Sequence, residues 1–468
     1  MRTSSAIELF LPLDREDTRP LHRQLEQQLR DAVRTGRLAP SSIVPSTRAL
    51  ARQLGVSRGI VVETYEQLTA EGYLASRPGG TTRVAREPTA PTARRAEPTP
   101  RRFLVDFRPG RPDLDEFPRA AWLRSFRRAV NETPSERLGY HDGRGALELR
   151  SALAAYLNRV RGAAADPASV VICTGFTQGL RLVASVLARA GARRVAVEDP
   201  GYVEARAMLR SAGLTVTGIA VDGSGIDVAR LERAKVDAVV VTPAHQYPTG
   251  GVLPPERRAA LAAWAARRNA FIVEDDYDAE FRYDREPIGA LQGLCPDHVV
   301  YAGSASKMLA PALRLGWLVA PASLAADLAR AKRADDLGSP GFDQLAFSEF
   351  LSSGELDRHL RRMRPIYRER RDALLASLRR HLPELEPTGA SAGLHVLAWL
   401  PRDVDEAELV RSASGAGIGL EGLADSRIAA GERGAIVFGY AAVSERAASE
   451  GARRLAALLP AARRRRGH

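Results

Sequence analysis

Short apolar runs alternate with longer helical stretches along most of this chain, and this alternation limits the folds available to it. The apolar runs are residues 170–173, 195–197, 236–241, 271–273, 298–302 and 315–320. Buried strands separated by helices are typical of a mostly parallel sheet covered by helices. We therefore predict an α/β fold for residues 105–468.

A rare lysine follows one of these predicted strands. The chain has only three lysines, at Lys235, Lys307 and Lys332. Arginine stays protonated and cannot form a Schiff base with an aldehyde, whereas a lysine beside another cation can lose its proton and attack one. Lys307 lies in a Ser/Gly-rich segment, with Arg314 as the nearby cation and Ser304 and Ser306 as hydroxyl donors to the same anion. The alternative is a solvated lysine in a surface loop.

Length and composition indicate an ordinary globular protein of several domains. The 468 residues suggest two to four domains, and 45% hydrophobic with 26% charged residues is usual for such proteins. No apolar run approaches the length of a membrane span and no signal-peptide core begins the chain, so we expect a cytoplasmic protein. Cys173 and Cys295 lack the spacing of a metal site or disulfide framework. The net charge of +12 is compatible with a polyanionic partner but does not establish one.

The first 85 residues predict three helices followed by a hairpin. Leucines recur every four residues from 21 to 29, which indicates a helix over residues 20–34. Ser46 is a plausible N-cap of a second helix that ends at Gly55, and Ser57 of a third that runs to about residue 71. Residues 72–84 contain a Pro-Gly-Gly turn between two short strands, typical of a wing. This arrangement indicates a winged helix-turn-helix, in which the second helix of the motif enters the major groove.

The start of the third helix carries residues suited to DNA. Arg58 can reach a guanine edge or a phosphate, Ser57 can donate to a phosphate, and Gly59 allows close backbone approach. The alternative is a three-helix domain that contacts protein. Residues 86–104 form a Pro/Arg-rich stretch without apolar periodicity, which we interpret as an extended linker. We interpret Arg463 and the arginines after it as a solvated tail rather than a DNA contact.

The stretch from Val44 to Leu74 resembles the winged helix-turn-helix of the GntR family. This resemblance implies binding of double-stranded DNA. By position, the family's DNA contacts fall on Arg48, Ser57, Arg58 and Gly59, with Arg77 in the wing. The family usually has threonine or asparagine where Gly59 stands, which puts one base contact in doubt.

Polar clusters follow the predicted strands. At 174–181 a Gly turn opens a helix whose first N–H groups, at Phe176 and Thr177, can hold a phosphate. Tyr202 can lie on a planar heterocycle. The run 274–278 contains four carboxylates and a tyrosine. A carboxylate can keep a pyridine nitrogen protonated, and a phenol can hydrogen-bond a ring hydroxyl. A metal site and solvated charges are the alternatives for these acids.

In order and spacing, these clusters resemble fold type I aminotransferases over residues 105–443, a fold with a smaller C-terminal α/β subdomain. With the GntR-like head, the whole chain resembles the MocR subfamily of bacterial regulators. This resemblance implies pyridoxal 5'-phosphate (PLP) as cofactor and a homodimer. In this resemblance Lys307 forms the Schiff base, Asp275 lies at the ring nitrogen and Tyr277 at the ring hydroxyl. Tyr202 stacks on the ring, and Tyr140 reaches the phosphate of the partner subunit's cofactor. The phosphate of the chain's own cofactor is held by Phe176, Thr177, Ser304, Ser306 and Arg314.

Two positions depart from the aminotransferase pattern. Tyr247 stands where N-P-T-G has asparagine, so the ring hydroxyl loses a donor unless Gln246 or His245 supplies one. Val437 stands where an arginine usually binds the substrate carboxylate, and Arg206 or Arg433 would have to replace that arginine as effector ligand.

Without that arginine, sensing of the cofactor becomes more plausible than turnover. The first hypothesis is a transcription regulator that senses PLP or an amino acid effector, with PLP synthesis genes as targets suggested by the family alone. The second is an active aminotransferase with an appended DNA-binding domain. A third is an aminotransferase-like scaffold that binds no cofactor.

Overall fold

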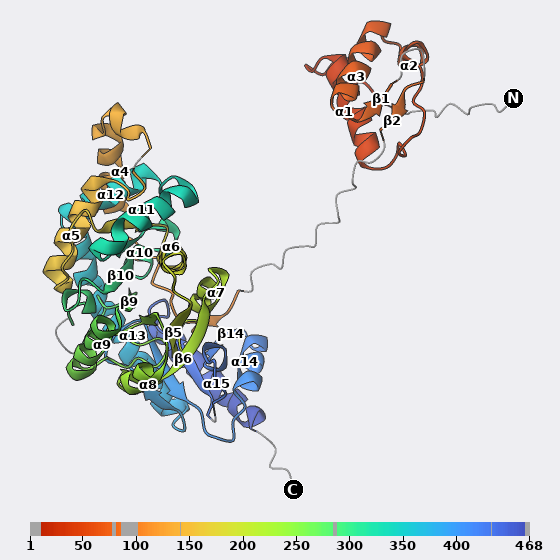
Figure 1. Ribbon diagram of the computed structural model, residues 1–468. Helices are drawn as coiled ribbons and strands as arrows, with labels where there is room; N and C mark the ends of the chain where they lie inside the picture. Colours follow the sequence, from red (N-terminus) through yellow and green to blue (C-terminus); the bar gives the residue numbers. More distant parts are fainter. Residues whose placement is uncertain are drawn as a thin grey trace. The chain divides into compact units, whose positions relative to one another are not determined.

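The computed structural model describes residues 11–76, 81–85, 102–140, 142–283, 288–431 and 433–463. The chain divides into two compact units, Met1–Arg101 and Arg102–His468 (Figure 1). Arg77 of the predicted wing and residues 86–101 of the predicted linker lie outside the described residues. The predicted start of the second domain, Val105, is the first residue of a strand. None of the described helices is long and apolar enough to cross a membrane.

The N-terminal unit consists of three helices and a two-stranded antiparallel hairpin. The elements are α1 (Leu21–Arg34), α2 (Thr47–Leu54), α3 (Arg58–Ala70), β1 (Leu74–Ala75) and β2 (Arg83–Val84). The Ser46 and Ser57 hydroxyls accept hydrogen bonds from the N–H groups of Ala49 and Ile60, so both serines cap helices as their positions predicted. Gly55 ends α2 in a left-handed conformation with φ of 64°, which glycine adopts without strain.

The second unit is built on an eight-stranded sheet with the order β4-β11-β10-β9-β8-β5-β6-β7. These strands are β4 (Val170–Cys173), β5 (Arg194–Asp199), β6 (Thr215–Asp222), β7 (Gly225–Ile226), β8 (Ala238–Val241), β9 (Phe271–Asp276), β10 (Val299–Ser304) and β11 (Gly316–Val319). Strands β10, β9, β8, β5 and β6 are parallel, while β11 is antiparallel to both of its neighbours and β7 to β6. The predicted mostly parallel α/β sheet is confirmed.

Alternate residues of β5 pack against different helices. Val195 and Val197 pack with α6 (Phe176–Arg189), α7 (Val203–Ser211) and α11 (Ala322–Asp336). Ala196, between them, packs with α8 (Val228–Arg233) and α9 (Pro255–Arg268). Because side chains of a strand alternate between the two faces, these runs are buried on both sides and consist almost wholly of apolar residues.

Helices and a small sheet complete the second unit. Helices α4 (Arg119–Glu132), α5 (Leu147–Arg161) and α12 (Gly341–Ser352) pack together, and the long α13 (Glu355–His381) leads to the C-terminal lobe. That lobe contains the antiparallel sheet β12 (Glu386–Thr388), β13 (His395–Trp399), β16 (Ala435–Gly439) and β15 (Glu421–Gly422), with α14 (Glu406–Gly415) and α15 (Glu445–Leu458). Strand β14 (Ile418–Gly419) pairs with β3 (Val105–Asp106). The smaller C-terminal α/β subdomain is thus confirmed.

Candidate functional site

A cavity of about 680 Å³ lies in the second unit, at the carboxyl ends of several strands of the large sheet. Its volume is in the range of small-molecule sites. Nine of the ten residues predicted for cofactor binding line it: Phe176, Thr177, Tyr202, Asp275, Tyr277, Ser304, Ser306, Lys307 and Arg314. The fold therefore brings together side chains that are up to 138 positions apart, counted from Phe176 to Arg314 (314 − 176).

Lys307 lies on the wall of this cavity. Its Ser/Gly-rich segment includes one helical turn, α10 (Ala305–Met308), directly after β10. The amine of Lys307 donates a hydrogen bond to the carbonyl oxygen of Gly110 at 2.6 Å. Burial lowers the pKa of Lys307 below that of an ordinary lysine, and the carboxylates of Asp278 and Asp275 raise it in part. A larger fraction of this amine is therefore unprotonated and nucleophilic at neutral pH than in a solvated lysine.

Two of the three acids on β9 have structural partners. Glu274 accepts hydrogen bonds from the backbone N–H groups of Leu291 and Gln292 at 2.8 and 2.9 Å. Asp276 accepts hydrogen bonds from Arg161 Nε and the Tyr301 hydroxyl, both at 2.8 Å. These two acids share one face of the strand and contribute to the packing of the sheet.

Asp275 differs from its neighbours because it points to the other face. It lines the cavity, is 8% exposed, and makes no hydrogen bond or ion pair with any described residue. Burial and the negative charges of Asp276 and Asp278 raise its pKa well above the usual range for an aspartate. A buried carboxylate without a partner needs a donor or a cation from a bound molecule.

A seat for an anion lies beside Lys307. Helix α6 begins after Gly175, whose φ of 108° favours glycine, and leaves its first N–H groups directed away from the helix. A Cβ at Gly175 would lie 3.4 Å from Nη2 of Arg314, so the guanidinium group lies directly over this turn. With Thr177, Ser304 and the helix dipole, this arrangement suits a phosphate.

Aromatic side chains line the rest of the cavity. The Tyr202 ring is 37% exposed and its centroid lies 6.1 Å from that of Phe176 and 6.2 Å from that of Tyr247. The Tyr277 hydroxyl lies 3.0 Å from Nδ1 of His245. Burial raises the pKa of Tyr202 to about 12 and raises that of Tyr277 well above the usual value for a tyrosine, so both phenols are protonated at neutral pH.

The structure also shows what replaces the customary asparagine. The Tyr247 hydroxyl donates to Glu421 of the C-terminal lobe at 2.7 Å. Gln246 does not line the cavity: its amide donates to the Pro200 carbonyl at 3.0 Å and to Glu198 at 3.2 Å. Of the two replacement donors that the sequence suggested, only His245 lies near a predicted cofactor residue, Tyr277.

Neither candidate effector arginine lines the cavity. Arg206 donates to the backbone carbonyls of Asp425 and Arg427 at 2.6 and 2.8 Å. Arg433 donates to the Leu400 carbonyl and the Glu386 carboxylate. In this structure, therefore, neither arginine replaces the carboxylate-binding arginine, because backbone and side-chain acceptors elsewhere hold both guanidinium groups. The tenth predicted residue, Tyr140, is 83% exposed and lies away from this cavity in the single chain.

Sequence reasoning missed several residues of the cavity wall: Gly110, Asp278, His395 and Glu421. Asp278 belongs to the acidic run 274–278, so that run could have pointed to it. The other three come from the segment before α4 and from the C-terminal lobe, where no local motif marked them.

The predicted DNA contacts of the first unit lie on its surface. Arg48 on α2, and Ser57, Arg58 and Gly59 at the start of α3, are all exposed. The Ser57 oxygen accepts the Ile60 N–H at 3.4 Å, which leaves its hydroxyl hydrogen available to a phosphate. An exposed helix N-terminus with a flanking arginine matches the recognition end of a helix-turn-helix.

Comparison with known proteins agrees with both units. Residues 21–84 match the profile of bacterial regulatory proteins of the gntR family, and residues 105–425 match that of class I and II aminotransferases. The chain is 34% identical over 465 residues to the probable rhizopine catabolism regulatory protein MocR of Rhizobium meliloti, covering 94% of each chain. The chain belongs to the MocR subfamily of GntR-type transcription regulators. The resemblance stated from the sequence motifs is thereby confirmed.

Other similar proteins include regulators and enzymes. This MocR-type chain is 33% identical to the pyridoxine biosynthesis transcriptional regulator PdxR of Corynebacterium glutamicum, covering 94% of this chain and 96% of that one. Among solved structures, the multiple substrate aminotransferase of Thermococcus profundus superposes with a TM-score of 0.71 at 26% identity, covering 78% of this chain and 92% of that chain. The aminotransferase fold implies PLP as cofactor.

The cavity residues fit that cofactor. The unpartnered Asp275 carboxylate suits a protonated pyridine nitrogen, and the turn at Gly175 beneath Arg314 suits a phosphate. Lys307 supplies an amine for the aldehyde and Tyr202 a ring for stacking. When bound, PLP would supply an aldehyde that captures amines and a ring that accepts electrons.

Proposed function

We propose that this transcription regulator binds PLP through a Schiff base to Lys307 and that occupancy of the cavity alters its binding to DNA. The observation that carries the proposal is the geometry of the cavity, which brings the Lys307 amine together with an unpartnered carboxylate and an arginine-capped anion seat. Binding of double-stranded DNA through Arg58 and its neighbours is the output. The pyridoxine biosynthesis role in the name of the PdxR relative supports PLP synthesis genes as targets.

The absence of a cavity arginine other than Arg314 among the described residues supports sensing of the cofactor itself. An amino acid would arrive with a carboxylate that a bidentate arginine normally orients, and Arg314 already serves the anion seat. In a variant of this proposal the effector is an amino acid, and a group other than an arginine binds its carboxylate. The exposed Tyr140 supports a homodimer in which it reaches the partner's cofactor.

The experiment pairs spectroscopy with DNA binding, using Lys307→Ala and the matched control Lys235→Ala. Lys235 is exposed and does not line the cavity. The wild-type chain and Lys235→Ala should gain the absorbance of a protonated imine with PLP, and PLP should change the mobility shift of DNA fragments selected from the genome. Lys307→Ala should lose both responses while still binding DNA. An imine band that survives in Lys307→Ala, with borohydride label elsewhere, rejects the assignment.

A second candidate function is a working aminotransferase with an appended DNA-binding domain. The superposition on the Thermococcus profundus enzyme and the completeness of the PLP seat favour it. Steady-state transamination with a panel of amino donors separates the two functions. Turnover well above that of free PLP, lost in Lys307→Ala, supports the enzyme; turnover no faster than free PLP supports the sensor.

A further inference from the structure

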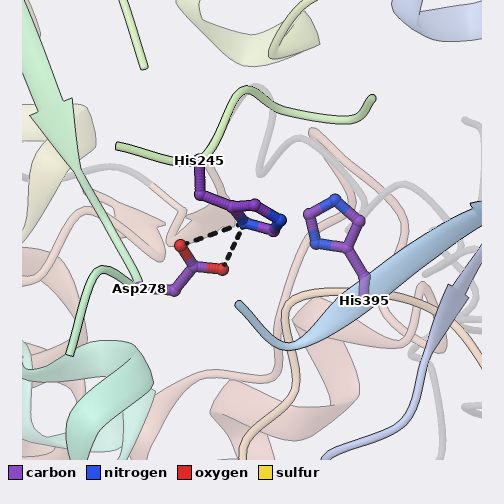
Figure 2. Close-up of side chains that lie close together, drawn as sticks. All are labelled: His245, Asp278 and His395. Carbon is purple, nitrogen blue, oxygen red and sulfur yellow. Dashed lines mark hydrogen bonds and ion pairs between the residues drawn. The ribbon is translucent and has the colours of Figure 1, made fainter. Parts of the chain in front are cut away.

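Two histidines and an aspartate form a buried cluster at the edge of the cavity (Figure 2). His245, Asp278 and His395 are 1%, 1% and 2% exposed. One nitrogen or oxygen of each lies within 4.8 Å of those of the other two. His395 comes from β13 of the C-terminal lobe, whereas the other two residues follow β8 and β9. His395 and Asp278 line the cavity.

The hydrogen-bond partners fix the tautomer of each ring. His395 Nε2 lies 3.2 Å from the Pro248 carbonyl oxygen, which can only accept, so Nε2 carries the proton and Nδ1 has a lone pair. His245 Nδ1 lies 3.0 Å from the Asp278 carboxylate and donates to it, so the lone pair of His245 is on Nε2. The Tyr277 oxygen, 3.0 Å from the same Nδ1, then accepts there and directs its own proton elsewhere.

These tautomers leave two imidazole lone pairs in a buried place. Within the described part of the chain, His245 Nε2 has no hydrogen-bond partner. The ring edge carrying it faces His395, with ring centroids 4.9 Å apart (Figure 2). Burying two imidazole nitrogens that face each other with no hydrogen-bond donor costs free energy, and a cation bound between them would satisfy both lone pairs.

Histidines that bind metals are usually held in this way: one ring nitrogen donates to a carboxylate or a backbone carbonyl, and the other binds the ion. We propose that His245 Nε2 and His395 Nδ1 bind a divalent transition-metal ion of the zinc type, with Asp278 orienting His245 and balancing the charge. Neutral imidazole suits zinc, copper and nickel, whereas magnesium and calcium prefer oxygen ligands. The remaining coordination positions face the cavity, where water or an oxygen of a bound ligand completes them.

The local packing holds the ligands in place. Gly393 has φ of 78°, and a Cβ at this position would overlap the His245 ring and the Asp278 carboxylate. Ligand nitrogens on a tetrahedral zinc ion lie about 3.4 Å apart, given bonds of about 2.0–2.1 Å. The His245 and His395 ring centroids lie 4.9 Å apart, so small side-chain rotations can bring the two ligand nitrogens to this separation.

The test is a titration of the untagged full-length chain, stripped with a chelator, with Co²⁺ and with Zn²⁺ in competition. We expect one ion per chain, a visible Co²⁺ spectrum, and X-ray absorption that reports two imidazole ligands. His245→Gln and His395→Gln should each weaken binding by about tenfold or more, and Asp278→Asn by about 10–100-fold. The proposal is overturned if the chain takes up no metal, in which case a bridging water is the partner of both rings. It is also overturned if metal binding is unchanged in both histidine variants.

Controls separate this site from loss of fold and from the PLP proposal. His359→Gln removes another buried ring, one bonded to the Met308 carbonyl outside the cavity wall, and should keep the metal. If the histidine variants fail to fold, the Co²⁺ spectrum and X-ray absorption of the wild-type chain still decide the ligands. Lys307→Ala should retain metal while losing the imine band, so the two proposals can fail independently.

Discussion

Replacement by asparagine should have opposite effects at the neighbouring residues Asp275 and Asp276 of β9: one should mainly weaken PLP binding and the other mainly lower the stability of the fold. In Asp276→Asn, the Arg161 guanidinium loses its counter-charge where both side chains are at most 2% exposed. Breaking a buried pair on one side costs about 3–5 kcal/mol. In Asp275→Asn, a buried carboxylate without a described partner becomes neutral, so we expect the free energy of unfolding to change by less than about 1 kcal/mol.

The PLP affinities should show the reverse order. Asp275→Asn removes the charged partner of the pyridine nitrogen, and a hydrogen bond to a charged group contributes about 1.5–3 kcal/mol, which corresponds to about 10–100-fold in affinity. Asp276→Asn should bind PLP nearly normally while folded. Urea unfolding of the apo protein followed by tryptophan fluorescence reports on the second unit alone, because all 4 tryptophans lie there. Equal destabilisation by both variants, or loss of PLP binding only in Asp276→Asn, would refute the assignment of Asp275 to the pyridine nitrogen and of Asp276 to a structural role.

Three further predictions follow from the geometry. In stopped-flow measurements, the rate of PLP capture by Lys307 should rise with pH to a plateau, with a midpoint below the pKa of an ordinary lysine. Asp278→Asn should move this midpoint to lower pH, because the Asp278 carboxylate raises the pKa of Lys307. A midpoint that moves to higher pH contradicts this prediction. Ser57→Ala should destabilise the first unit by about 1 kcal/mol in thermal melts because the α3 cap is lost, and Ser57→Gly by less. Arg58→Ala should weaken operator binding by about 1–3 kcal/mol and non-specific binding less; equal losses in mobility-shift titrations would limit Arg58 to phosphate contact.

The strand-end position of the site was predictable, because parallel strands bring their carboxyl ends to one edge of the sheet. The clusters after β4, β9 and β10 therefore had to lie close together, and nine predicted residues do line one cavity. The choice of Asp275 agrees with the two-residue period of β9, which separates it from Glu274 and Asp276.

Tertiary contacts decided what the sequence could not. Arg206 is close in sequence to Tyr202, but the carbonyls of Asp425 and Arg427 determine where its guanidinium lies, and no local pattern reveals these acceptors. Gly110 and His395 enter the cavity wall from segments far from any recognised motif.

In the proposed sensor, a signal from the cavity to DNA begins where ligand occupancy changes contacts between the lobes of the second unit. Hydrogen bonds that join the lobes beside the cavity include the one from Tyr247 to Glu421 and those from Arg206 to the backbone at Asp425 and Arg427. Glu421, Asp425 and Tyr247 also line the cavity, so a ligand contacts both lobes at once. A ligand shifts an equilibrium only by its unequal affinity for the two states. A ligand that contacts groups on both lobes can provide such a difference, whereas its contacts with Thr177 and Ser304 involve only the side of the large sheet.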